Sequence, residues 1–463
     1  MQPAEWIKHR LIATLVVTVV AFMPVAIPGP AIFLQKWIAG QSQENPGFLL
    51  TPIENQTWFL AFGSVALLIL LLSFGSLKWH QYSRIQNIII VSVQVWFLVV
   101  SLRALFTAGI LWSYTELFVL AGSLVVFWAT LLAAQRDVNL IRKFAMVSIP
   151  ITFTICAIAI LQNFGADPLP YSETVSGRNE TIQGKNVIAS TFGHPNYMGS
   201  FLVPQTLLLI GYGATFKGRL IQVILGLLTC LVIYVLLLAG TRGPFIAFVA
   251  GMMTFIVLNS TSGRFSRWFV AGAGTLILVL VAVLYFSPEA RPGFLIQDRI
   301  FATKEIATRT LYWAAGLHAF SENPILGIGV GQFDEQFARI LTEMPATREG
   351  EIWYFALSET IRGVRPGYMH NDHLQILVEL GLIGFSAWVT LWATLLGSAV
   401  GGLRISSPYY VGLISAMVAF FIDAVFSFPF HIPCSAVLFW FIVALFINAN
   451  GPPYCSKNPE MQT

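Results

Sequence analysis

The sequence predicts an all-α polytopic membrane protein with about twelve transmembrane helices and one large loop that contains helices of its own. Two observations carry this prediction. Of the 463 residues, 56% are hydrophobic and only 10% are charged, and the mean hydropathy is +0.73. A soluble domain carries roughly 25% charged residues, so a chain this poor in charge must place much of its surface against lipid. The second observation is a series of apolar runs close to the ~20 residues that a spanning helix needs.

These apolar runs fix the order of the predicted spans. Lys8 and Arg10 precede the first run as they would in a signal peptide, but no small-x-small cleavage site follows it. We therefore interpret this run as an uncleaved anchor. The predicted spans lie at residues 11–28, 57–75, 88–108, 114–134, 144–163, 196–213, 220–239, 243–259, 268–287, 376–399, 408–428 and 434–449.

The positions of lysine and arginine predict the orientation, because short cytoplasmic loops are enriched in basic residues. With the N-terminus inside, every second connection is short and basic, and the alternation holds along the whole chain. Both termini are therefore predicted to be cytoplasmic. The basic residues on the predicted inside are Lys8, Arg10, Lys78, Arg84, Arg136, Arg142, Lys143, Lys217, Arg219, Arg264, Arg267, Arg404 and Lys457.

The longest outside connection is predicted at residues 288–373, between the ninth and tenth spans. The whole chain, residues 1–463, is predicted to form a single transmembrane domain that carries this loop. Within the loop, residues 299–320 have the apolar spacing of a helix, and Asn323-Pro324 is expected to end it. The apolar candidates on that helix are Ile306, Leu311, Trp313, Ala314 and Leu317.

Composition and motifs also argue against several classes of function. The formal net charge of +4 is small for this length, which argues against a nucleic-acid-binding protein. The four cysteines form no CxxC pair and indicate neither a disulfide framework nor a zinc site. The sequence has no Walker A or Rossmann glycine pattern and no clustered acidic residues that would hold a metal ion. No cofactor or metal is therefore predicted.

Polar residues gather at the predicted outer ends of the helices. The stretch MHNDHLQILVELGLIG, residues 369–384, opens the tenth span and places His370 and His373 on one helix face. Ionisable groups near membrane depth are costly and usually face a cavity, so they are candidates for function. The candidates are His370, Asn371, His373, Arg242 in AGTRGPF, His194 and Asn196 in FGHPNYMG, Arg178 in SGRNET, and Arg309 in ATRTLYW.

Several of these residues have structural alternatives. The alternative for Arg242 is a contact with lipid headgroups, and for His370 it is a helix-mouth residue that water satisfies. Arg309, taken alone, is typical of a solvated loop. Gly381 and Gly384 are interpreted as positions that permit close helix approach.

Other polar residues near the helix ends are interpreted as structural. Asp423 and His431 are expected to form an interhelical pair or to pack as polar groups between helices. Arg103, which lies within the third predicted span, is expected to form a buried pair with Glu116.

Arginine and histidine at the outer face of a membrane suit one kind of chemistry. The guanidinium fork matches phosphate oxygens bidentately, which suits a pyrophosphate at headgroup depth. A histidine near its ordinary pKa can accept a proton from an attacking hydroxyl. Together they predict a transfer in which a lipid-linked pyrophosphate leaves, an acceptor alcohol takes its place, and the arginines stabilise the charge of the leaving group.

These motifs resemble the O-antigen ligase and Wzy-type polymerase superfamily over about residues 188–450. The TRG at Arg242, the segment RTLYW…ENPILGIGVGQF at residues 309–333 and FGHPNYMGSFL at residues 192–202 resemble stretches of that family and come in the same order. The family's histidine signature is H-[NSQ], nine residues, then G-x-x-[GTY]. The residues that meet it are His370, Asn371, Gly381 and Gly384.

The resemblance implies a GT-C-like, metal-independent, inverting glycosyltransferase in the inner membrane of a bacterium, with its site and the 288–373 loop on the periplasmic side. It would move a glycan from an undecaprenyl-pyrophosphate carrier to an acceptor hydroxyl. On this analogy His370 activates the acceptor. The pyrophosphate contacts would be Arg242, Arg309 and Arg178, and the other substrate contacts His194, Asn196, Asn371 and His373.

The sequence leaves the acceptor open. Transfer to lipid A core, as in lipopolysaccharide synthesis by an O-antigen ligase, is the preferred interpretation. The alternatives are another glycan repeat, as in a Wzy-type polymerase, and a protein serine or threonine, as in a pilin-type O-oligosaccharyltransferase. A small-anion transporter of the bicarbonate type is an alternative of another class. It is disfavoured because the polar groups concentrate at the outer rim and no paired helix interruptions are visible.

Overall fold

The helices account for all regular structure in the part of the chain that the structure, a computed structural model, describes. The described residues are 3–25, 52–74, 82–107, 114–137, 139–166, 168–169, 188–216, 218–261, 303–344, 366–402 and 407–450. The α-helices are α1 (Pro3–Phe22), α3 (Pro52–Phe74), α4 (Arg84–Leu105), α5 (Tyr114–Arg136), α6 (Leu140–Asn163), α7 (Pro195–Gly213), α8 (Arg219–Ala239), α9 (Arg242–Thr261), α12 (Thr303–Glu322), α13 (Gln332–Glu343), α15 (Asp372–Gly402), α16 (Pro408–Phe426) and α17 (Pro433–Ala449).

Helices lie at each predicted span except 268–287, which falls outside the described residues. Among the described residues, eight helices are long and apolar enough to cross a membrane, and two further apolar segments, at Arg10–Val25 and Pro433–Ala449, are shorter. The exposed side chains on these helices are largely Leu, Ile, Val and Phe, as lipid contact requires. The chain is a multi-pass membrane protein.

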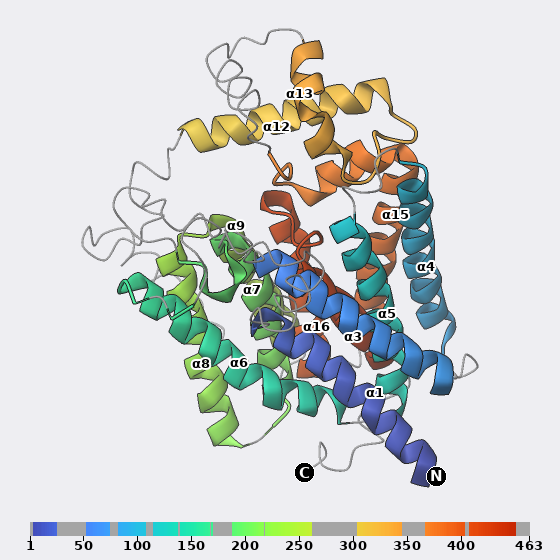
Figure 1. Cartoon of the computed structure of the whole chain (residues 1–463). Coiled ribbons are helices and arrows are strands. Elements are labelled where there is room, and N and C mark those ends of the chain that lie inside the picture. The colour runs from blue at the N-terminus through green and yellow to red at the C-terminus, as the bar shows by residue number, and fades with distance from the viewer. Residues whose placement is uncertain are drawn as a thin grey trace, which may run out of the picture.

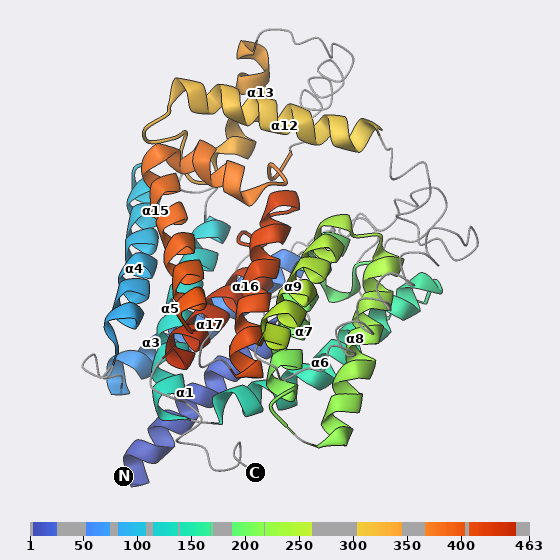
Figure 2. The same cartoon turned by 180° about the vertical axis from the view of Figure 1, so that it is seen from behind.

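The bundle has two distinct ends, which Figures 1 and 2 show from opposite sides. At one end, where α1 begins, Gln86 near the start of α4 donates a hydrogen bond to the carbonyl of Ile447 near the end of α17. At the other end, α12 and α13 lie across the bundle. The helices of the 288–373 loop therefore lie opposite the start of α1. Which end faces the periplasm stays a prediction.

Close packing of α16 against α7 and α9 forms the centre of the bundle. Gly211 and Gly412 let α7 and α16 approach, because a Cβ added to either glycine would collide with the backbone of the other. α7 and α17 are buried on nearly every face, and α17 packs on α5 while α15 packs on α4. This core fixes the α16–α17 connection, against which the candidate site is built.

α12 and α13 have a small apolar core of their own. α12 ends at Glu322, directly before Asn323-Pro324, which confirms the predicted stop. Leu311 is buried, as expected. Leu317 is 49% exposed, because the buried face of α12 is formed by Leu311, Ala315 and Ala319. The buried residues of this core are Leu311, Ala315, Ala319, Ile328, Phe333, Phe337, Ile340, Leu341, Met344, Met369 and Val378.

α15 is broken at Gly381, whose φ of +63° and ψ of −166° are not helical. A break leaves backbone groups on both sides without their partners within the helix. The segment 324–329 satisfies them from outside. Before the break, the N–H groups of Ile328 and Gly329 donate to the carbonyls of Val378 (3.0 Å) and Glu379 (2.9 Å). After the break, the N–H groups of Leu382 and Ile383 donate to the carbonyls of Pro324 (2.8 Å) and Ile325 (3.3 Å).

This break corrects the expectation that Gly381 permits two helices to approach. A Cβ at Gly381 would collide with the carbonyl oxygen of Ile325, and one at Gly327 would collide with the backbone of Glu379. The stretches NPILGIG and ELGLIG, which are far apart in sequence, therefore form one structural unit.

The same unit corrects the expectation for Arg103. Its guanidinium donates to the carbonyls of Leu326 and Gly327, both at 2.8 Å, rather than pairing with Glu116. The reason is that the turn at residues 324–327 presents carbonyl oxygens to the end of α4, where a guanidinium can bridge two of them.

Candidate active site

The connection between α16 and α17 is the meeting point of the candidate residues. We call the stretch from Phe426 to Ile432 the α16–α17 turn. Its sequence, FSFPFHI, alternates aromatic side chains with residues that break a helix, so it leaves backbone groups available and presents rings to several neighbouring elements. Contacts reach it from α7, α12, α15 and the segment that precedes α15.

His370 lies against this turn, just before α15. Its backbone has a φ of +55°, in the left-handed region that non-glycine residues seldom adopt. Its ring contacts the edge or face of Phe428, with centroids 5.0 Å apart at 75°. Its Nδ1 is buried and has no hydrogen-bond partner among the described residues. Burial, followed by the charges of Arg309 and His194, lowers the pKa of His370 to about 3, so the ring is neutral at ordinary pH.

Arg309 reaches the same turn from α12. Its Nη1 donates a hydrogen bond to the carbonyl oxygen of Phe426 at 3.0 Å. This bond holds the guanidinium at Phe426, which precedes Phe428 by two residues. The ring of His370 packs on Phe428. The effect of its charge on His370 shows that the two side chains share one electrostatic environment. The contact also joins the α12–α13 layer to the bundle.

Arg242 is the first residue of α9, and the start of that helix packs against the end of α16. A Cβ added to the next residue, Gly243, would lie 3.0 Å from Cβ of Phe426 and 3.4 Å from Oδ1 of Asp423. The backbone of Arg242 is therefore anchored beside the residue that Arg309 contacts. The N-terminus of a 20-residue helix also adds positive potential there.

His194 and Asn196 lie at the start of α7, on the same side. His194 is the N-cap of α7, and its Nδ1 accepts a hydrogen bond from the N–H of Asn196 at 3.2 Å. The ring of His194 packs on Tyr197 at 4.7 Å, and Tyr197 contacts Phe428 at 5.3 Å. Tyr197 therefore connects the ring of His194 to the turn.

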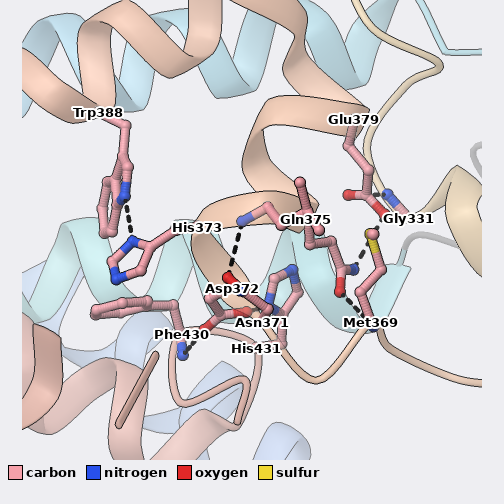
Figure 3. A network of polar contacts seen from close by, with 11 residues as sticks. Gly331, Met369, Asn371, Asp372, His373, Gln375, Glu379, Trp388, Phe430 and His431 are labelled. Carbon is pink, nitrogen blue, oxygen red and sulfur yellow. Dashed lines mark hydrogen bonds and ion pairs between the residues drawn. The ribbon is translucent and has the colours of Figure 1, made fainter. Parts of the chain in front are cut away.

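His373 has a different environment from His370. Its Nδ1 accepts a hydrogen bond from Trp388 Nε1 at 3.0 Å, and its Nε2 lies 3.0 Å from the carbonyl oxygen of Phe421. Since a carbonyl only accepts, Nε2 carries the proton. Both nitrogens are thus used within the protein, as Figure 3 shows for the Trp388 side. His373 holds α15 to its neighbours, and this arrangement offers a substrate no ring nitrogen.

Asn371 and Asp372 begin α15. The side-chain oxygen of Asn371 accepts a hydrogen bond from the N–H of Leu374 at 3.0 Å, so Asn371 caps the helix. Asp372 is completely buried, and its two carboxylate oxygens bind the N–H of Phe430 at 2.9 Å and Nδ1 of His431 at 2.7 Å. Figure 3 shows these groups turned toward one another.

A second network ties this segment to α13. Gln375 accepts from the N–H of Met369 at 3.0 Å and donates to Glu379 at 3.1 Å. Glu379, which is 4% exposed, also accepts from the N–H of Gly331 at 2.9 Å. These contacts are drawn in Figure 3. On the other side, Trp313 of α12 donates to the carbonyl of Met369 at 3.0 Å.

The structure thus brings His370, Arg309, the start of α9 with Arg242, and His194 with Asn196 to one turn. His373 and Asn371 lie beside that site, and their side chains make hydrogen bonds within the protein. Arg178 lies outside the described residues. Within the described ranges, no group of three or more His, Cys, Asp or Glu side chains could hold a metal ion.

Sequence reasoning missed the pairing of Asp372 with His431. Asp423 was the expected neighbour of His431, but the hydrogen bond at 2.7 Å is made by Asp372. Burial lowers the pKa of His431, but the adjacent Asp372 carboxylate outweighs it and the net pKa is raised to about 9. The aspartate within HNDH was a visible signal. Nothing in the sequence pointed to a partner 59 residues away.

Chemically, this arrangement can hold a neutral imidazole beside cationic groups at one end of a membrane bundle. A neutral ring with a nitrogen that has no partner among the described residues can accept a proton. The guanidinium of Arg309 and the N-terminus of α9 favour an anion nearby. The geometry therefore suits the activation of a hydroxyl next to a negatively charged group.

The comparisons with known proteins agree with this description. Residues 226–389 match the family described as O-Antigen ligase, a range that contains Arg242, Arg309 and His370. A Rickettsia bellii protein described as "Putative polysaccharide ligase" is 24% identical over 168 residues, which cover 36% of this chain and 37% of that protein. The matched part thus spans little more than a third of the length of that relative.

Proposed function

We propose that the protein is a membrane glycosyltransferase, because residues 226–389 match the family described as O-Antigen ligase. It transfers a glycan from an undecaprenyl-pyrophosphate carrier to an acceptor hydroxyl on lipid A core, at the periplasmic face of the bacterial inner membrane. In this proposal the α12–α13 end of the bundle is the periplasmic end, the fold is GT-C-like, and both termini are cytoplasmic.

The observation that carries the proposal is the meeting of His370, Arg309 and the start of α9 at the α16–α17 turn. These groups come from three parts of the chain that are far apart in sequence. A structural role for any one of them would not require the others. A base next to cationic groups at the membrane boundary is what transfer from a lipid pyrophosphate requires.

The proposed reaction is a single displacement. The acceptor oxygen attacks the anomeric carbon of the first sugar, and its proton passes to the ring of His370. The bond from that carbon to the pyrophosphate oxygen breaks, and the electron pair leaves with the lipid pyrophosphate. Attack from the side opposite the leaving group inverts the anomeric configuration.

The arginines take the charge of the leaving group in this proposal. Arg309 is held by the carbonyl of Phe426, which limits the positions of its guanidinium. Arg242 starts α9 next to the same residue, and Arg178 is a third proposed contact. Guanidinium groups can stabilise a pyrophosphate without a metal ion, so the proposed mechanism is metal-independent.

The test uses purified full-length protein in proteoliposomes with an undecaprenyl-pyrophosphate-linked glycan and lipid A core. Wild type should form the glycosylated acceptor, and His370→Ala should leave the lipid-linked donor unreacted. His318→Ala is the matched control, because His318 lies on α12 and pairs with Glu322, away from the turn. Transfer by His370→Ala at the wild-type rate would overturn the proposed role of this histidine. No transfer by wild type to lipid A core would overturn the proposed acceptor.

A further inference from the structure

The backbone at His370 needs support from its surroundings. A left-handed φ of +55° at a residue with a Cβ persists only where neighbouring contacts hold it. The ring itself supplies little of that support, because its Nδ1 makes no hydrogen bond among the described residues and the ring packs on Phe428. The position of the ring must therefore be set through the backbone on either side and through Phe428.

Asp372 connects both of these supports. It is two residues after His370, and its N–H donates to the carbonyl of Ser427 at 3.2 Å. Its carboxylate binds the N–H of Phe430 and the ring of His431. The chain that carries His370 and the turn that carries Phe428 are thus tied together on both sides of the ring contact.

The Asp372 side chain is buried, and the His431 side chain is 15% exposed. The carboxylate is 0% exposed and also lies in the first turn of α15, where the helix dipole favours a negative charge. His431 faces a cavity of about 90 Å³ between α4, α5, α15 and α17, which is also lined by Glu116 and Glu379. The ring of Tyr368 also packs against His431, with centroids 5.0 Å apart. The Asp372 carboxylate, followed by Glu116 and Glu379, outweighs the effect of burial and raises the pKa of His431, which favours the protonated ring.

We propose, on the premise of the proposed function, that Asp372 and His431 form a charged pair that positions His370 for proton acceptance. The pair acts through the backbone of residues 370–372 and the ring of Phe428, and it does not itself touch the substrate. Losing it shifts the imidazole relative to the acceptor hydroxyl. A displacement of about 1 Å in a catalytic group can lower the rate by roughly 100-fold.

The first measurement compares Asp372→Asn with wild type in the proteoliposome assay. We expect kcat to fall about 10- to 100-fold, as positioning effects do, while KM for the undecaprenyl-pyrophosphate donor stays within about 2-fold because Arg309 is untouched. Asp137→Asn is the matched control: Asp137 pairs with Lys143 at 2.6 Å at the opposite end of the bundle. An unchanged kcat in a folded Asp372→Asn protein would overturn the proposal.

The second measurement is a pH profile, which a purely structural role would not change. The ion pair holds His370 in position at pH values below the raised pKa of His431, which is about 9. The pair is lost as the pH rises through that value. Wild-type kcat should therefore fall near pH 9. His431→Asn keeps a hydrogen-bond donor near the position of Nδ1 but cannot titrate. We expect it to have a several-fold lower kcat at pH 7.5 and no fall near pH 9.

These outcomes also separate this proposal from the proposed function. If Asp372→Asn does not fold, the profile of His431→Asn decides, and a fall near pH 9 that persists in that variant overturns the positioning role. If wild type transfers glycan, His370→Ala does not, and both pair variants match wild type, only the positioning proposal fails. If wild type forms no product with the donor, the proposed function itself fails.

Discussion

The two faces of the α16–α17 turn hold histidines in opposite chemical situations. On one face, His370 rests on Phe428, and its Nδ1 has no hydrogen-bond partner among the described residues. On the other face, His431 binds Asp372, and nearby His373 uses both ring nitrogens. The residue types are the same, but only one of them is left with a nitrogen that can receive a proton.

This difference separates chemistry from support within one short segment. A histidine with both nitrogens used contributes to stability, because breaking either bond leaves a buried polar group unsatisfied. A histidine with an unpaired nitrogen contributes little to stability and is available for reaction. The two faces should therefore respond differently to substitution.

The largest expected effect comes from exchanging His370 for alanine and measuring kcat and thermal stability together. Loss of a general base lowers kcat by about 10²- to 10⁴-fold, while the melting temperature should change little because the ring makes no hydrogen bond to a described residue through Nδ1.

His373→Ala is the matched variant three residues away. It leaves the indole N–H of Trp388 and the carbonyl of Phe421 without their partner, at a cost of about 1–3 kcal/mol for each group. We expect a clear drop in melting temperature and less than a roughly 10-fold loss of kcat in the folded protein. Equal kinetic losses in the two variants would erase the distinction between the two faces.

The next largest effect concerns α15, the helix that carries Asp372 and His373. Gly381→Ala places a side chain at φ +63° and against the carbonyl of Ile325. Strain of this kind costs about 1–3 kcal/mol before the collision is counted. We expect a lower melting temperature and a lower yield of folded protein.

Gly397→Ala in the same helix is the control for this substitution. A Cβ at Gly397 would meet nothing within 4 Å, and alanine favours a helix by up to about 1 kcal/mol relative to glycine. It should be neutral or stabilising. If Gly381→Ala is as stable as Gly397→Ala, the break in α15 is not required for the fold.

The sequence predicted the bundle well because hydropathy depends on local composition. Apolar runs of the right length became helices wherever the structure describes them, and Asn323-Pro324 ended α12 as proline chemistry requires. The same local logic failed at Gly381. Helical periodicity continues through it, and only the segment near Gly327, about 50 residues away, explains why the helix breaks there.

The candidate site was predictable in its residue types but not in its pairings. His370, Arg309 and Arg242 stood out because ionisable groups near membrane depth are costly. The pairing of Asp372 with His431, and the supporting role of His373, depend on which side chains meet in space. Helical spacing predicted that His370 and His373 share one face of the helix. In the structure His370 precedes α15, and its left-handed backbone conformation takes it off that helical face.

A smaller effect is expected from Arg309→Ala, measured as KM for the undecaprenyl-pyrophosphate donor. A charge-assisted hydrogen bond contributes about 1.5–3 kcal/mol, so KM should rise roughly 10- to 100-fold if Arg309 binds the pyrophosphate. Arg339→Ala is the matched control, because Arg339 lies on α13 and pairs with Glu343 at 3.2 Å on an exposed surface. A KM unchanged by Arg309→Ala would remove this residue from the donor site.

The smallest effect is a near-constant rate in mildly acidic solution. The pKa of His370 is lowered to about 3 by burial and then by Arg309 and His194. Its imidazole is therefore neutral in the free protein well below pH 6. With an ordinary pKa of about 6.5, kcat/KM would fall roughly 10-fold between pH 7.5 and 5.5. With the lowered pKa, we expect a change of less than about 2-fold.

Donor binding should shift the protonation equilibrium of His370 in a defined direction. A bound pyrophosphate brings negative charge next to Arg309 and favours the imidazolium form, so it raises the pKa of His370. Because kcat reports the complex and kcat/KM reports the free protein, the acid limb of kcat should lie at higher pH than that of kcat/KM. Acid limbs at the same pH would mean that the charge of the donor does not affect the pKa of His370. The donor and His370 would then lie on unrelated surfaces of the turn.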